Sequence, residues 1–518
     1  MLYFVGGSLS FIEADLHAET NGSWLPISNT IAITAVAPFT GYLQDLLGRR
    51  NITLVGSITI MVGISLIGSA RSFGMGVAGM AISGMGAGVC ELTALAGISD
   101  IVPVRQRGIA LALMTGCIIP FTPYVMYSQL LSTYHTWRWG QWIALIWNAL
   151  VFIGLATTYF PKSHPRMEGF TKRSILARID YIGAALSITG IALFLVALQA
   201  GGYSHSWTSA YVLSQLIIGI FLVMAWVMWE AKFAKFPMVP KEMFQGQRIV
   251  ALAFFIAFVA GMDFYSVINF FPLSFSTVYS PDPVQVGLKG LGYGISTTVG
   301  AVFFNALLST KIPAKVILMV AAGLMSKSLS LDCYWILTNL TAAFAGALAA
   351  TSPDTPKLAV ALGTIGSFGI GGVLVPSATV ALIVVPDALL ATTAALSLSI
   401  RTIGGSIGFT IYYNVFVNKL TKALPEKVAE YAMDAGLSAA DAPGFVKAFL
   451  TAPKTITTVP GYTPQIAAAA AIGTKWAYSY ALKYVWICSI PFGVLAFLSC
   501  CFLPSIKKYQ TNRVAVAL

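Results

Sequence analysis

Three charged residues lie inside long apolar runs of the sequence, and their side chains are the first candidates for chemistry. Glu91 follows a glycine-rich stretch, Asp263 lies among aromatic residues, and Arg401 precedes a pair of glycines. A charge is costly to bury in hydrocarbon, so charged residues in such runs mark ion or substrate pathways, or pair with one another. We expect Glu91 to bind a proton or a cation, and Asp263 to be a second protonatable group.

Glu91 and Arg401 also have purely structural interpretations. The Glu91 carboxyl can be hydrogen-bonded between two packed helices. Arg401 either pairs with a carboxylate across the molecule or anchors the packing of its own helix. The sequence leaves these interpretations open.

A second group of informative residues lies in a short polar segment between two apolar runs. Residues 41–50 read Gly-Tyr-Leu-Gln-Asp-Leu-Leu-Gly-Arg-Arg. Gly41 and Gly48 allow a tight connection between helices, because glycine adopts backbone angles that other residues avoid. Asp45 can pair with Arg49 or Arg50, or lie at the positive N-terminal end of a neighbouring helix. Contacts of this kind form in one conformation and break in another, which predicts a gating loop.

The sequence lacks the patterns that indicate an enzyme or an ATP-driven pump. It contains no Gly-x-x-x-x-Gly-Lys-[Ser/Thr] phosphate loop and no nucleophile–base motif. Its 6 cysteines lie mostly inside apolar runs without Cys-x-x-Cys spacing, and its 4 histidines are scattered. We therefore expect no metal site, no cofactor and no enzymatic activity.

Composition identifies the medium in which the chain folds. Of 518 residues, 57% are hydrophobic and 10% are charged, and the mean hydropathy is +0.79; a soluble domain carries roughly a quarter charged residues. In lipid only helices and closed barrels satisfy the backbone, and these apolar runs are continuous rather than alternating. The cations behind the net charge of +12 lie in short clusters between the runs, which argues against nucleic acid. The sequence predicts an all-α membrane protein with the lipid bilayer as its partner.

The apolar runs predict about fourteen transmembrane helices, grouped as six, two and six. Residues 1–160 form an N-terminal six-helix bundle whose first helix is short and incomplete at its start. Residues 161–248 hold basic loops and two extra linker helices, and 249–503 hold a C-terminal six-helix bundle with a long extracellular loop at about 418–476. Residues 504–518 form a cytoplasmic tail. The stretch 315–350 is too long for one span and too short for two, so we expect a broken helix or a segment foreign to the mature protein.

The distribution of lysine and arginine predicts the orientation, because cytoplasmic loops are enriched in these residues. Eighteen lie in loops on the side that carries Arg49 and Arg50, including Arg105 and Arg107, and four lie in short loops on the opposite side. The first side and both termini are therefore expected to be cytoplasmic. Asn21, in an Asn-Gly-Ser sequon, then faces outside as a candidate glycosylation site.

Residues 41–50 resemble the G-x-L-x-D-x-x-G-R-R signature of the major facilitator superfamily, and the six-two-six pattern resembles its fourteen-span drug:proton antiporter branch. Between residues 84 and 147 the likeness narrows to the fungal trichothecene efflux pump family, through the glycine-rich run 84–97, the segment 102–108 and Trp137-Arg138-Trp139. Residues 375–377 and 399–409 continue it. Met80 stands where drug exporters of the superfamily carry an arginine, so coupling through that arginine is not expected.

This resemblance implies a major-facilitator-type bundle and a secondary active transporter that exports a hydrophobic small molecule, such as a mycotoxin or a drug, by alternating access. It implies a proton gradient as the energy source and a monomeric transport unit. The implied location is the plasma membrane, with the vacuolar membrane as the alternative. Two other functions stay open: siderophore-iron uptake by the same fold, and a non-transporting, degenerate relative.

Overall fold

The chain folds almost entirely into helices. The computed structural model describes residues 2–17, 22–160, 178–244, 248–325, 346–451, 456 and 459–515. Within these ranges there is no strand, and a single β-bridge joins Gly201 and His205. The α-helices are α1 (Leu2–Gly7), α2 (Leu9–Asp15), α3 (Trp24–Leu47), α4 (Arg49–Gly68), α5 (Phe73–Ile101), α6 (Arg107–Gly116), α7 (Tyr124–Tyr134), α8 (Arg138–Thr158), α10 (Tyr181–Ala200), α11 (Ala210–Met228), α12 (Arg248–Ser274), α13 (Pro283–Leu307), α14 (Ala314–Met325), α15 (Pro356–Val384), α16 (Leu390–Asp434), α17 (Ala442–Thr451) and α18 (Pro464–Cys501).

Ten helical stretches of the described chain are long and apolar enough to cross a membrane. Two further helices, α3 and α13, have 24 and 25 residues but fall below that level of hydropathy. Large apolar side chains are exposed on the outer faces of the helices; Phe221 of α11, for example, is 64% exposed. Extensive exposed apolar surface requires a lipid or protein partner. The prediction of an all-helical, multi-pass membrane protein is confirmed.

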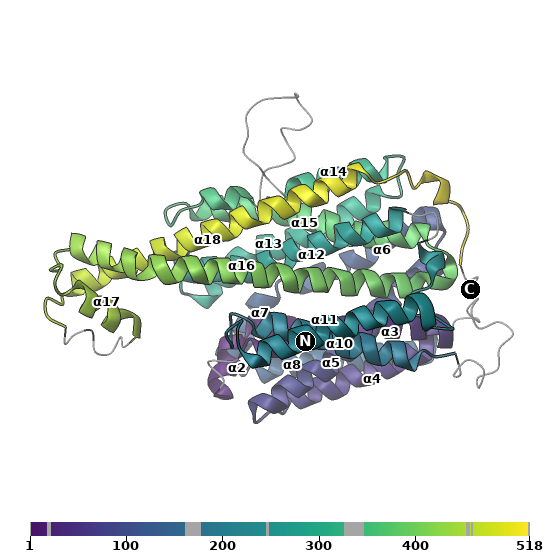
Figure 1. The fold of residues 1–518 in the computed structure, drawn as a ribbon, viewed down its shortest axis with the longest axis horizontal. Helices are drawn as coiled ribbons and strands as arrows, with labels where there is room; N and C mark the ends of the chain where they lie inside the picture. Colours follow the sequence, from purple (N-terminus) through teal and green to yellow (C-terminus); the bar gives the residue numbers. More distant parts are fainter. Residues whose placement is uncertain are drawn as a thin grey trace.

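Two groups of helices lie side by side in Figure 1, one drawn mainly from the first part of the chain and one from the second. In the first group α5 packs against α3 and α4, and α8 packs against α4. In the second group α15 packs against α12, α13 and α14, and α16 packs against α12 and α18. The groups meet where α3 packs against α16 and where α6 packs against α13. Helices α10 and α11 pair with each other, and α10 packs on α3.

Glycines bring the helices of the first group close together, as small residues do in membranes. A Cβ added at Gly86 of α5 would lie 2.7 Å from the backbone nitrogen of Ile60 in α4. A Cβ at Gly84 would lie 2.5 Å from the backbone oxygen of Asn29 in α3. Real Cβ atoms do not approach so closely, so a side chain at either position would push two helices apart.

The apolar run at residues 109–131, one of those from which the sequence predicts a transmembrane helix, is broken. Helix α6 ends at Gly116, residues Ile119–Phe121 form a 3₁₀ turn, and α7 begins at Tyr124. Pro120 and Pro123 lie in the break, and a proline inside a helix removes a backbone donor and clashes with the preceding turn. The two parts then pack differently: α6 lies against α13, whereas α7 contacts both α13 and α1.

Residues 418–476, which we expected to be a long polar loop, are largely helical in their described part. Helix α16 continues for 45 residues to Asp434, and α18, with 38 residues, begins at Pro464. Both helices extend beyond the others in Figure 1, and α17 packs against α16 there. Phe445 of α17 is buried in an apolar cluster with Val428 and Ile466. The extension therefore has a small core of its own.

The irregular regions of the sequence are described in part. Residues 2–15 form two short helices that meet at Ser8, rather than half of one helix. In the stretch 315–350, α14 ends at Met325 and Gly346–Ala350 form a 3₁₀ helix. The residues between these two helices lie outside the described ranges, as do Asn21 with its predicted glycosylation and the basic loop at 161–177.

Gly86→Ala tests the close packing of α4 and α5. The added methyl group would overlap the backbone at Ile60, and overpacking of this kind costs about 1–3 kcal/mol. We expect a lower apparent melting temperature in detergent, followed by tryptophan fluorescence. Gly154→Ala in α8, where a Cβ meets nothing within 4 Å, is the matched control and should leave the melting temperature unchanged. Equal shifts in the two variants would contradict this role of Gly86.

Candidate functional site

The predicted gating loop connects α3 and α4 through Gly48. This glycine has a φ of 85°, in the left-handed region that favours glycine, and α4 begins at the next residue, Arg49. Gly41 lies elsewhere, at the contact between the two helix groups. A Cβ there would lie 2.7 Å from the backbone oxygen of Ala391 in α16. One glycine therefore makes the turn, and the other allows α3 and α16 to touch.

Asp45 lies near the end of α3 and binds the first turn of α16. Its carboxylate accepts hydrogen bonds from the backbone nitrogens of Ala391 and Thr392, at 3.1 and 2.8 Å, and from the Thr392 hydroxyl at 2.7 Å. Because α16 begins at Leu390, these amides belong to a helical turn that lacks intrahelical acceptors. The carboxylate also lies at the positive end of the helix dipole. Asp45 thus joins the first helix group to the second.

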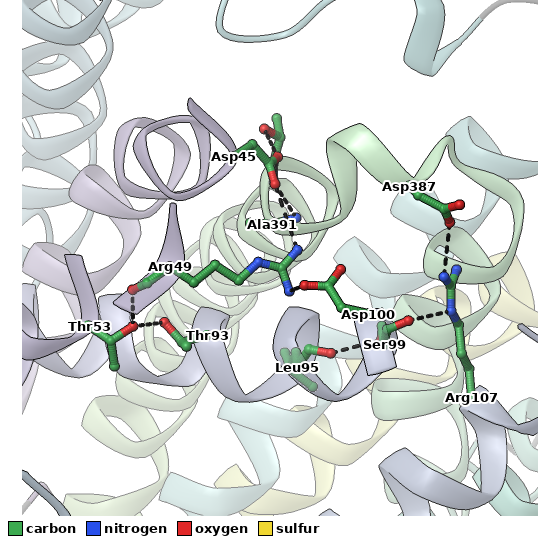
Figure 2. A network of polar contacts seen from close by, with 11 residues as sticks. Asp45, Arg49, Thr53, Thr93, Leu95, Ser99, Asp100, Arg107, Asp387 and Ala391 are labelled. Carbon is green, nitrogen blue, oxygen red and sulfur yellow. Dashed lines mark hydrogen bonds and ion pairs between the residues drawn. The ribbon is translucent and has the colours of Figure 1, made fainter. Parts of the chain in front are cut away.

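Arg49 lies beside Asp45 and is buried with it. Its guanidinium pairs with Asp45 at 3.8 Å and with Asp100 near the end of α5 (Figure 2). We call Asp45, Arg49, Asp100 and the first turn of α16 the gate cluster. All three charged side chains are buried, and loss of one member of such a set leaves an uncompensated charge in a medium of low dielectric constant.

The second arginine of the motif, Arg50, is not part of the gate cluster. Its guanidinium donates to the backbone oxygen of Ala156 in α8 at 2.9 Å and lies 4.3 Å from the centre of the Phe160 ring. Both contacts are within the first helix group. The two adjacent arginines therefore differ, because only Arg49 supports the contact with α16.

A second connection between the groups is made by Arg107, at the start of α6. Its buried guanidinium donates to the backbone oxygens of Ser99 at 2.9 Å and Leu382 at 2.6 Å, and to the Asp387 carboxylate at 3.0 Å. Ser99 is in α5 of the first helix group. Leu382 is in the last turn of α15 in the second group, and Asp387 follows that helix. The side chain of Arg105, predicted for the same loop, is exposed.

Glu91 and Arg401 form an ion pair between the two groups. Glu91 is on α5 and Arg401 is on α16, and their side chains meet at 3.1 Å. The Glu91 side chain is 42% exposed and that of Arg401 is 18% exposed. The carboxylate is therefore partly accessible, whereas the guanidinium is largely enclosed. Of the two interpretations of Arg401, pairing across the molecule is the one found.

Asp263 lies apart from this pair, inside the second helix group. It is on α12, is 1% exposed, and accepts a hydrogen bond from the Tyr412 hydroxyl of α16 at 2.9 Å. Its second carboxylate oxygen has no hydrogen-bond partner among the described residues. The two candidate carboxylates thus differ: Glu91 is partly exposed and pairs with a cation, whereas Asp263 is enclosed and pairs with a phenol.

Buried charged residues join the two helix groups at one end, and the sequence of this chain matches one protein family over nearly its whole length. The model of the fungal trichothecene efflux pump family matches residues 5–518. The chain belongs to this family. It is accordingly a membrane transporter and not an enzyme, as the lack of catalytic motifs predicts.

Curated relatives are also described as transporters. The MFS-type transporter prx5 of Penicillium rubens is 25% identical over 527 residues, which cover 98% of this chain and 88% of prx5. The efflux pump FUS6 of Gibberella moniliformis is 26% identical over 517 residues, which cover 97% of this chain and 84% of FUS6. The MFS efflux transporter aclA of Aspergillus oryzae is 28% identical over 305 residues, 58% of this chain, and the match spans 54% of aclA.

Two solved structures share the fold. The proton:xylose symporter XylE, of the major facilitator superfamily, is similar with a TM-score of 0.53 at 14% identity, over 99% of this chain and 94% of XylE. The human organic anion transporter MFSD10 is similar with a TM-score of 0.51 at 13% identity, over 96% of this chain and 89% of MFSD10. Likeness at these identities supports the predicted major-facilitator-type bundle.

Three residues of these contacts were missed by the sequence interpretation: Asp100, Asp387 and Tyr412. Asp100 had a usable signal, because it is a carboxylate at the end of the apolar run that contains Glu91. Asp387 also ends an apolar run, but a carboxylate at a membrane boundary gives no sign of its partner. Nothing in the sequence separates Tyr412 from the other aromatic residues of its run.

Arg49→Gln tests whether the gate cluster closes this end of the protein. The substitution leaves Asp45 and Asp100 without a cation, at a cost of about 3–5 kcal/mol, so the closed state should lose population. A cysteine at Ala394, buried between the two groups, reports this by its reaction with a water-soluble maleimide in a chain without its native cysteines. Arg50→Gln is the matched control. Labelling that is no faster in Arg49→Gln than in Arg50→Gln would show that the cluster does not close the gate.

Proposed function

We propose that the chain exports a hydrophobic small molecule across the plasma membrane and that the proton gradient drives this export. The match of the family model to residues 5–518 carries the proposal. In this proposal the chain crosses the membrane about fourteen times, and the paired helices α10 and α11 are the two spans added between the bundles. One chain supplies both helix groups, so a monomer is a complete unit for alternating access.

The end that carries the gate cluster is proposed to be cytoplasmic. Arg49, Arg50, Arg105 and Arg107 lie at this end, together with the basic residues of the C-terminal segment, and cytoplasmic loops are enriched in such residues. The gate cluster and Arg107 connect the two helix groups at this end. The present conformation is therefore one that is closed toward the cytoplasm, and it must open there to load a substrate for export.

The Glu91–Arg401 pair is proposed to link protonation to this opening. It lies on α5 and α16, the same two helices whose ends meet in the gate cluster. While Glu91 is ionised, the pair attracts the two groups to each other. A proton on Glu91 removes that attraction, and a cationic substrate would compete for the same carboxylate. A ligand with different affinity for two conformations shifts their populations, as exchange of protons for substrate requires.

Coupling through an arginine on the fourth span is not part of this proposal. Met80, at the position where an arginine would stand, is buried in an apolar cluster with Leu25, Ile67 and Trp137. Glu91 lies about three turns further along the same helix and faces solvent. The proton-binding role is therefore proposed for Glu91 rather than for any group near Met80.

Asp263 is proposed as a second protonation site. Burial of a carboxylate without a cation is costly, and the only hydrogen bond found for the Asp263 carboxyl among the described residues comes from the Tyr412 hydroxyl. Tyr412 is on α16, which also carries Arg401 and the amides that bind Asp45. A change of charge at Asp263 would therefore act on the same helix as the other two sites.

Glu91→Gln tests the central ion pair. Glutamine keeps the shape of the side chain but does not ionise. Transport should therefore lose its dependence on pH while the protein still binds substrate. The measurement is efflux of a fluorescent apolar compound from proteoliposomes under a series of pH gradients. Glu430→Gln, which removes a carboxylate from an exposed pair with Lys427 on the extension of α16, is the control. Normal pH dependence in Glu91→Gln would remove Glu91 from the coupling mechanism.

Cells that lack the protein test export against iron uptake. We expect lower tolerance of hydrophobic toxins and normal uptake of a labelled siderophore, because the proposed flux is outward. The reverse pattern would favour siderophore-iron uptake. Purified protein that moves neither class of compound in proteoliposomes would favour a non-transporting relative.

A further inference from the structure

A basic groove lies at the end of the second helix group, between the start of α12 and the chain that follows α18. It encloses about 700 Å³. We call it the tail groove, and we call residues 504–515 the tail. The tail groove is lined by Phe244, Arg248, Ile249 and Ala251 on one side and by Pro504, Ser505, Lys508 and Tyr509 on the other.

The tail groove lies at the depth at which lipid headgroups are expected. Arg248 is the first residue of a candidate membrane span, and the last candidate span ends at Cys501, just before the tail. The groove thus opens at the boundary between hydrocarbon and water. Its lining combines apolar side chains, which suit acyl chains, with two cationic side chains, which suit an anionic headgroup.

Arg248 and Lys508 are the cations of the tail groove. Neither forms an ion pair with a carboxylate of the described chain, and the sequence from 504 to 518 contains no acidic residue. Arg248 also lies in the first turn of α12, where free amides and the helix dipole favour an anion. The Ser505 hydroxyl adds a neutral donor. This donor set fits a phosphate group.

We propose that the tail groove binds the phosphate-bearing headgroup of an anionic phospholipid. The phosphate would lie between Arg248 and Lys508, and the acyl chains would follow the apolar surface of α12. The choice of a phospholipid rests on the cytoplasmic orientation proposed above, because anionic lipids are concentrated in the cytoplasmic leaflet and attract basic segments at the membrane surface.

A bound headgroup would hold in place a segment that also contacts the gate. In Figure 1 the tail runs from the end of α18 toward the first helix group. The backbone nitrogen of Val104 donates to the Arg513 oxygen at 3.0 Å, and that of Ala515 donates to the oxygen of Asp100, a member of the gate cluster, at 3.1 Å. Arg513 pairs with Asp387 at 2.9 Å. The lipid therefore stabilises the closed gate through the tail.

Lipid binding is measured on the purified full chain in detergent, titrated with short-chain phosphatidylinositol phosphate and followed by native mass spectrometry. We expect Arg248→Gln and Lys508→Gln each to weaken binding about fivefold, as loss of one cation near a charged lipid predicts. Lys507→Gln is the matched control, because Lys507 is in the same turn but does not line the groove. An equal loss of affinity in Lys507→Gln would show that the lipid is attracted by the overall positive charge of the tail. That result would overturn the proposed site.

Two further ligands separate the sources of phosphate. Short-chain phosphatidylcholine should bind weakly, and equal affinity would reduce the site to an apolar groove. Soluble inositol phosphate without acyl chains should also bind weakly, and affinity equal to that of the lipid would show that the ligand is a free phosphate compound. Either result would overturn the proposal.

Hydrogen exchange tests the effect on the tail. The amides of Val104 and Arg105 donate to tail oxygens, so their exchange should slow when phosphatidylinositol phosphate binds, and should not slow in the Arg248→Gln, Lys508→Gln double variant. Unchanged exchange despite lipid binding would disprove the link to the gate. None of these measurements requires transport or a known orientation. Lipid binding can therefore fail while the proposed export stands, and export can fail while lipid binding stands.

Discussion

Arg49 is a buried cation between two buried carboxylates, Asp45 on α3 and Asp100 on α5. Each of these charges loses several kcal/mol of hydration on burial, so all of them depend on their mutual contacts. With all three ionised, the set carries one net negative charge, and the N-terminus of α16 supplies about half a positive charge together with the hydrogen bonds to Asp45. The remaining negative charge is therefore partly offset only while α16 lies against α3. Gly41 makes that contact sterically permissible.

In the proposed mechanism, the two ion-pair sites on α5 have different roles. Glu91 and Asp100 are on the same helix, about 13 Å apart along its axis, and both depend on α16, directly or through Asp45. The gate cluster is buried and sets the strength of the closed contact. The Glu91–Arg401 pair is partly exposed on the side of Glu91, and in the proposed mechanism it is the pair that responds to protons. A change at the accessible pair alters the balance at the enclosed cluster because α5 and α16 are rigid elements shared by both.

Features that depend on residues close together in the sequence could be predicted. The helical spans, the loop at 41–50 and the contact of Asp45 with a helix N-terminus follow from local patterns. The pairing of Glu91 with Arg401 could not be assigned, because the partners are 310 positions apart and several carboxylates were available. The end of α16 exposes charged residues such as Lys422, Glu426 and Glu430, so hydropathy does not reveal that this helix continues into 418–476. The break at Pro120 has a local signal in the proline itself, but the length of the apolar run alone predicts an unbroken helix.

Asp387 shows why the tail adjusts the gate rather than locks it. This carboxylate binds Arg107, which is buried and has two backbone acceptors besides, and it binds Arg513, whose side chain is 56% exposed. An exposed ion pair contributes about 0–1 kcal/mol, whereas the buried contacts of Arg107 persist when the tail leaves. Loss of the Asp387–Arg513 pair alone would thus change the ratio of closed to open states by a factor of about five at most, and loss of the tail's backbone hydrogen bonds to Val104, Arg105 and Asp100 would add to this. A lipid that acts through the tail would therefore tune the proposed gate, because the buried contacts of Arg107 do not involve the tail.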